Sequence, residues 1–179
     1  MANDETHDAC SCSCPADDKG LLVSQAQNQI GLVQVWAQRN RLDLAALYLA
    51  HAEKLIELAQ AEGADIRAVQ LDILTCRLLL ADLAGKPVEE TLALARQCVA
   101  LAAAIYPEKH PAIAVARGNL GEILAKSGAS EEARTELSQA IFILTDAKSV
   151  TEIFTKEYLN NCFINCARIL QSLPPRPRI

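Results

Sequence analysis

The sequence has few aromatic residues, no long apolar run and no basic stripe. Aromatic residues make up 4% of the 179 residues, and β-branched residues nowhere form the alternating pattern of a half-buried strand. No run of about 18 apolar residues is present, so a membrane-spanning helix is not expected. The formal net charge of −5 disfavours a general nucleic-acid or membrane-surface binder, because both surfaces are negatively charged.

The beginning of the chain lacks the features of a secretory signal. Residues 1–20 are acidic and polar, whereas a signal needs a basic start followed by an apolar stretch. We therefore expect an intracellular protein, in the cytoplasm and with the nucleus as an open alternative, whose seven cysteines are present as thiols or metal ligands.

Alanine and leucine dominate the 51% of the chain that is hydrophobic, and both favour helices. Glycine and proline divide the sequence into about seven helical segments, so the expected fold is all-α. The expected boundaries are a cysteine-containing lead-in over residues 1–20, a helical domain over residues 21–173, and a Pro/Arg tail over residues 174–179. Asp43, Asp65, Ser130 and Thr151 are expected at helix starts.

The segment from His110 to Thr145 contains a regular series of small and large apolar residues. The series is Leu120-Gly121, Leu124, Gly128, Ala133, Leu137 and Ala140. Glycine and alanine allow two antiparallel helices to approach closely, while leucine fills the space between them. This spacing matches a tetratricopeptide-type repeat, and Gly85 followed by two glutamates indicates an earlier copy. Stacked antiparallel helical hairpins of this kind are typical of binding scaffolds.

Three segments resemble the C-terminal domain of SET and MYND domain-containing lysine methyltransferases. They are Tyr106–Pro111, Gln70–Cys76 and the cysteines Cys10, Cys12 and Cys14. The resemblance implies a helical regulatory domain that contacts chaperones, although this chain has neither the SET nor the MYND module. The cysteine spacing also differs from the family's post-SET pattern. A second resemblance, at His110, Pro111, Ala114, Asn119 and Leu120, is to the repeats of kinesin light chains.

Cys10, Cys12 and Cys14 form a candidate zinc site. Thiolates suit Zn²⁺, which needs four donors in a structural site, and His7 or Asp8 could supply the fourth. The alternative is a redox-labile tail without metal. If the SET and MYND resemblance holds, a SET domain supplies the missing ligand.

Asn119, Arg117 and Lys126 are the candidate binding residues. In a tetratricopeptide-type pair we expect Asn119 to face the concave groove, where its amide can donate to and accept from a peptide backbone. Arg117 and Lys126 would add positive charge, and in chaperone-binding repeats such a clamp holds a C-terminal carboxylate. No nucleophile context or phosphate-binding glycine loop is present, so we expect no enzyme activity.

The leading hypothesis is a noncatalytic module that binds a protein or peptide, with a chaperone tail among the candidate partners. The alternative is a fragment that acts as the C-terminal regulatory domain of a SET and MYND-type methyltransferase.

Overall fold

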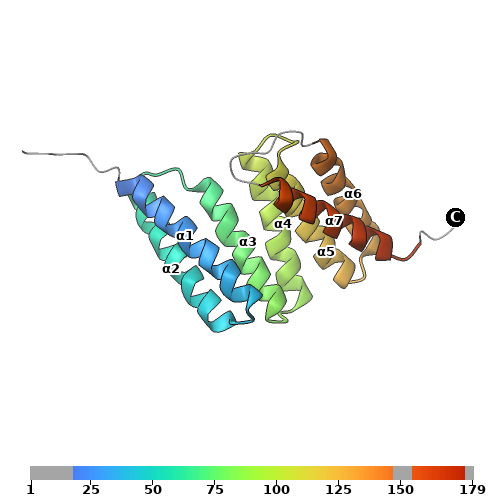
Figure 1. Ribbon diagram of the computed structural model, residues 1–179, viewed down its shortest axis with the longest axis horizontal. Coiled ribbons are helices and arrows are strands. Elements are labelled where there is room, and N and C mark those ends of the chain that lie inside the picture. The colour runs from blue at the N-terminus through green and yellow to red at the C-terminus, as the bar shows by residue number, and fades with distance from the viewer. Residues whose placement is uncertain (1–17, 147–154, 176–179) are drawn as a thin grey trace, which may run out of the picture.

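The computed structural model describes residues 18–146 and 155–175, and those residues form seven α-helices without any strand (Figure 1). The helices are α1 (Asp18–Gln38), α2 (Leu42–Ala61), α3 (Arg67–Leu83), α4 (Val88–Ile105), α5 (Pro111–Lys126), α6 (Ser130–Asp146) and α7 (Lys156–Ser172). Consecutive helices pair as the hairpins α1–α2, α3–α4 and α5–α6, and α7 packs across α5 and α6. The all-α, stacked-hairpin prediction is confirmed.

Two hydrophobic cores stabilise the stack, and α3 contributes to both. Val69, Ile73 and Cys76 of α3 pack with α1 and α2. Leu71 and Leu78, on another side of the same helix, pack with α4 and the helices that follow. Because one helix supplies both cores, the first hairpin is attached to the rest of the molecule through α3.

The helix α5 is the most enclosed element of the second core. Ten of its sixteen residues are buried, and it packs against α4, α6 and α7. Two glycines allow these neighbours to approach. A Cβ atom on Gly118 would lie 2.9 Å from the Sγ of Cys166 in α7, and one on Gly121 would lie 2.6 Å from the Cγ of Leu137 in α6. Gly121, one of the small residues predicted from the repeat, therefore sets the spacing of α5 and α6, and Gly118, which was not predicted, sets that of α5 and α7.

The turns after α3 and α5 are built alike. Gly85 and Gly128 follow these helices with φ angles of 64° and 82°, in the left-handed region that a side chain disfavours. Each glycine ends the first helix of a hairpin, which supports the internal repeat inferred from the sequence.

Several predicted helix starts were displaced. The structure places Arg41 at the N-cap of α2, and Asp43 lies inside the first turn, where it pairs with Arg41 at 2.8 Å. Ile66 precedes α3, and the side chain of Asp65 accepts from the backbone N–H of Arg67. Thr155 caps α7, whereas Thr151 lies outside the described residues. At the first two starts the aspartate pairs with a nearby arginine, and at the third another threonine supplies the capping hydroxyl. A rule that reads caps from residue type alone does not include these neighbours.

Among the helices of the described residues, none is both long and apolar enough to cross a membrane.

We predict opposite effects for two glycine-to-alanine substitutions. Gly121→Ala forces a methyl group against Leu137, which is fully buried, and overpacking of this kind costs about 1–3 kcal/mol. Gly31→Ala, in α1, meets nothing within 4 Å and should stabilise the chain by about 0.5–1 kcal/mol through helix propensity. Thermal unfolding followed by circular dichroism should show a lower melting temperature for Gly121→Ala alone. Equal melting temperatures for the two variants would contradict the close packing of α5 on α6.

Candidate functional site

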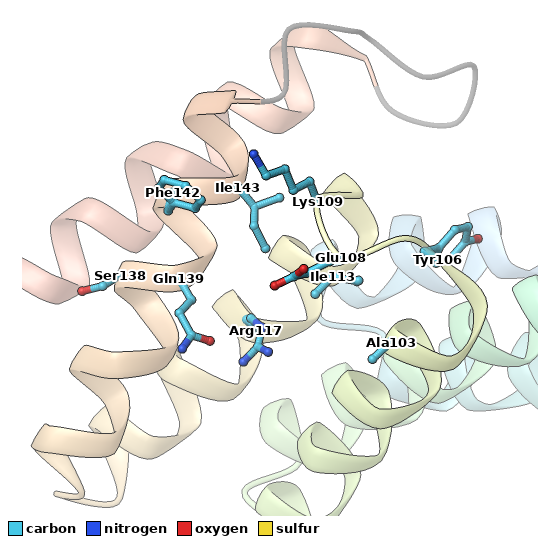
Figure 2. Close-up of a pocket in the computed structure, with 10 residues that line it drawn as sticks. All are labelled: Ala103, Tyr106, Glu108, Lys109, Ile113, Arg117, Ser138, Gln139, Phe142 and Ile143. Carbon is cyan, nitrogen blue, oxygen red and sulfur yellow. The ribbon is translucent and has the colours of Figure 1, made fainter.

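A pocket of about 640 Å³ lies between α4 and α6, with α5 as its floor (Figure 2). Its volume is in the range of about 300–1,000 Å³ that is usual for ligand pockets. The lining residues come from α4, the α4–α5 connection, α5 and α6. They are Ala103, Tyr106, Glu108, Lys109, Ile113, Arg117, Ser138, Gln139, Phe142 and Ile143.

The pocket exists because α4 presents a small side chain opposite larger ones on α6. Ala103 is exposed on α4 and leaves space that a longer side chain would fill. Ile113 and Ile143 are buried and form an apolar base. Phe142 is 62% exposed at the edge of the pocket, which is unusual for a large aromatic side chain. The pocket therefore combines a fixed base with an exposed aromatic surface.

The wall formed by the α4–α5 connection is held by aromatic stacking. The rings of Tyr106 and His110 lie 4.1 Å apart and nearly parallel, with an interplanar angle of 6°. The Nδ1 of His110 accepts a hydrogen bond of 3.2 Å from the backbone N–H of Ala112, which caps α5. The segment Tyr106–Pro111 noted in the sequence thus builds both a helix start and a pocket wall.

Each cation that lines the pocket is paired with a carboxylate. Arg117 donates to Glu136 at 2.6 Å, and both side chains are partly buried. Lys109 donates to Asp146 at 2.8 Å and lies 5.7 Å from the centre of the Phe142 ring. The bond to Asp146 raises the pKa of Lys109, so this lysine stays charged. Positive charge at the pocket is therefore neutralised by the chain itself.

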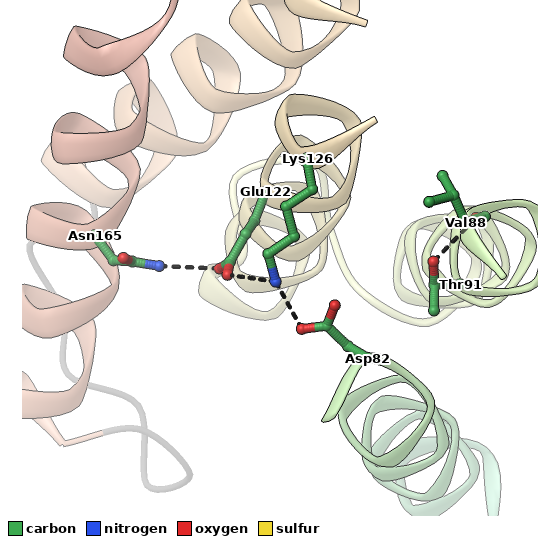
Figure 3. Close-up of polar contacts among 6 residues, drawn as sticks. All are labelled: Asp82, Val88, Thr91, Glu122, Lys126 and Asn165. Atoms are coloured by element: carbon green, nitrogen blue, oxygen red, sulfur yellow. Dashed lines mark hydrogen bonds and ion pairs between the residues drawn. The ribbon is translucent and has the colours of Figure 1, made fainter. Parts of the chain in front are cut away.

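Lys126 lies away from the pocket and joins two helices. Its Nζ is 2.7 Å from Asp82 of α3 and 3.1 Å from Glu122 of α5, and Asn165 of α7 donates to Glu122 at 3.2 Å (Figure 3). This line of polar contacts runs from α3 through α5 to α7. Figure 3 also shows Thr91, a buried polar residue whose hydroxyl donates to the carbonyl of Val88.

Asn119 is half-buried on α5, and its amide has no hydrogen-bond partner among the described residues. A helix turns by about 100° per residue, so Asn119 and Lys126 share one side of α5 while Arg117 lies on nearly the opposite side. The structure therefore does not bring the three predicted residues together. Arg117 belongs to the pocket, and the other two residues belong to the side of α5 that meets α3 and α7.

Sequence reasoning missed Phe142, Glu108 and Ala103 as residues of a site. A weak signal was present, because Phe142 falls beside the buried positions Ala140 and Ile143 without belonging to their stripe. The space opposite Phe142, beside Ala103, depends on how α4 packs against α6, which cannot be read from the sequence.

The predicted zinc ligands Cys10, Cys12 and Cys14 lie outside the described residues. Within residues 18–146 and 155–175, no group of three or more His, Cys, Asp and Glu side chains is arranged to hold a metal ion. The four cysteines in those ranges are free thiols. Burial raises the pKa of Cys76 to about 12 and that of Cys166 to about 11, so both remain protonated and unreactive at neutral pH.

No protein-family model matches this chain, and no curated protein matches its sequence. Among solved structures, it is similar to a Podospora anserina protein described as a kinesin light chain with nearly identical TPR-like repeats. The match has a TM-score of 0.56 at 20% identity and covers 83% of this chain and 73% of the other. At this identity the likeness shows the fold alone, which is that of TPR-like helical repeats. It gives no support to an origin in the SET and MYND methyltransferases.

We predict that the cap formed by His110 makes folding sensitive to mild acid. Burial lowers the pKa of His110, and a protonated Nδ1 could not accept from Ala112. A histidine with a lowered folded-state pKa contributes stability that is present above its unfolded pKa of about 6.5 and lost below it. Urea unfolding measured at pH values of about 7.5 and 5.5 gives the free energy of unfolding at each pH. Between these values His110→Asn should lose less of this free energy than the parent chain, because asparagine can cap α5 and does not titrate in this range. The same pH dependence in both proteins would rule out this role.

Proposed function

We propose that this chain is a protein-interaction module that binds a peptide segment or partner domain in the pocket between α4 and α6. The observation that carries the proposal is the pocket of about 640 Å³ with the exposed Phe142 at its edge, held between two stacked hairpins. TPR-like folds generally mediate protein–protein interactions, and repeat stacking creates extended surfaces for them.

The pocket is preorganised for binding. Ile113 and Ile143 belong to the core, and the Tyr106–His110 stack fixes the connecting wall. A partner would not have to order these groups, so less of the binding free energy would be spent on immobilising them. Ser138 and Gln139 are exposed on α6 and offer hydrogen bonds to an extended backbone.

The pocket's chemistry suits recognition without catalysis. Ser138 makes no hydrogen bond within the described part of the chain, so no base activates its hydroxyl there. Arg117 and Lys109 hold carboxylates of the same chain. We therefore assign no reaction to this site.

Capture of a chaperone's C-terminal carboxylate would need a cation that is available to it. Lys126 is bound by Asp82 and Glu122, and Arg117 is bound by Glu136, so both predicted clamp cations are engaged. Asn119, whose amide has no partner in the described residues, remains our proposed contact for a peptide backbone, but on a second surface of α5 that faces away from the pocket. The alternative role in a SET and MYND-type methyltransferase is supported by none of the comparisons with known proteins.

We predict that filling the pocket abolishes partner binding. Ala103→Trp places a large ring in the space between α4 and α6, whereas Ala46→Trp makes the same change at an exposed position of α2. Affinity capture with quantitative mass spectrometry should recover a set of proteins with the unmodified chain and with Ala46→Trp. We expect recovery to fall about tenfold or more with Ala103→Trp, which corresponds to about 1.4 kcal/mol. Both variants should melt like the parent, and equal recovery with both would refute the pocket as the binding site.

Asn119→Ala supplies an independent prediction. Because its amide has no partner in the described residues, removing it should leave the melting temperature unchanged. A lost hydrogen bond to a peptide bound on this side of α5, away from the pocket, would weaken the capture of that peptide's parent proteins several-fold, by about 0.5–1.5 kcal/mol. Titration of a captured partner against both proteins measures this, and unaltered affinity would remove Asn119 from the binding surface.

A further inference from the structure

The pocket between α4 and α6 is lined by one carboxylate that makes no hydrogen bond or ion pair within residues 18–146 and 155–175. This carboxylate belongs to Glu108, which is exposed. The bond from Lys109 to Asp146 raises the pKa of Lys109, and the charge of the neighbouring Glu108 helps to raise it further. The two cations of the lining, Lys109 and Arg117, are held by Asp146 and Glu136. Three carboxylates thus face two cations, and the pocket retains one negative charge.

The carboxylate of Glu108 lies beside an apolar part of the pocket. Figure 2 shows Glu108 directed into the space between α4 and α6, close to Ile113, with Phe142 and Ile143 on the facing helix. A ligand that fits this arrangement has an apolar group for the base and a positive charge next to it. The chain's net charge of −5 also favours a positively charged ligand.

We propose that the pocket binds a basic peptide segment, in which an aromatic or large aliphatic side chain contacts Phe142 and Ile113 while an adjacent Lys or Arg pairs with Glu108. This inference rests on the proposed function and adds the chemistry of the partner. An acidic segment would face Glu108 and would have to displace Asp146 or Glu136 from its cation. Burial of the apolar anchor supplies most of the affinity, because an exposed ion pair contributes little, and the charge sets the preference.

The size of the pocket agrees with such a segment. A volume of about 640 Å³ holds more than one side chain, so an anchor, its basic neighbour and part of their backbone fit together. Ser138 and Gln139 lie along α6, where they can bond that backbone.

The test is selection from a display library of random peptides on the full chain, with three variants beside it. Ala103→Trp fills the pocket, Glu108→Gln removes the free charge, and Glu89→Gln makes the same change at an exposed position at the other end of α4. We expect the parent and Glu89→Gln to enrich peptides with an aromatic or leucine residue beside Lys or Arg. Ala103→Trp should enrich none of these, and Glu108→Gln should keep the apolar anchor but lose the basic neighbour.

Fluorescence anisotropy of the most enriched peptide then measures the effect of the charge. We expect Glu108→Gln to bind about two- to fivefold more weakly than Glu89→Gln, with the difference shrinking at high salt. Enrichment of acidic or uncharged peptides that Ala103→Trp abolishes would overturn the inference and leave the proposed function standing. No enrichment, or enrichment that survives Ala103→Trp, would overturn both. Self-association that depends on concentration and is lost in Ala103→Trp would make a second copy the occupant, against the inference.

Discussion

The close approach of α5 to its neighbours is the constraint on which the second core depends. Gly118 and Gly121 lie one turn apart on α5 and leave room for Cys166 of α7 and Leu137 of α6. Without this approach, α6 could not bury Leu137 completely and α7 could not lie across the hairpin. The floor of the pocket and the side that carries Asn119 belong to the same helix, so both inherit its fixed position.

Ion pairs around α5 link it to its neighbours and contribute little to stability. The contacts of Lys126 with Asp82 and Glu122 are partly exposed, and pairs of this kind contribute about 0–1 kcal/mol. Asp82 nevertheless links Lys126 to α3, and the hydrogen bond from Asn165 links Glu122 to α7. The same pairs neutralise the charge of Lys126, which an anionic partner would need. Contacts between helices therefore also disfavour anionic partners.

The sequence predicted the hairpins because their determinants are local. Gly85, Gly128 and the Ala–Leu series act within one helix or one turn, and periodicity exposes them directly. The site was only partly predictable, because its properties arise between distant segments. The prediction grouped Arg117 with Asn119 and Lys126, although helical spacing alone places Arg117 on the other side of α5. Spacing could not show that Asp82 binds Lys126 or that Glu136 binds Arg117. Phe142 became a candidate only once the space left by Ala103 was seen.

The pocket is bounded by helices of two different hairpins, α3–α4 and α5–α6. Its width therefore depends on the angle at which one hairpin stacks on the next, which is the quantity that sets the curvature of a helical-repeat protein. An occupant wedged between α4 and α6 would fix that angle. Because α3 is shared with the first core, the fixed angle would extend to α1 and α2. Binding at one pocket would thereby fix the relative orientation of all three hairpins in the described residues.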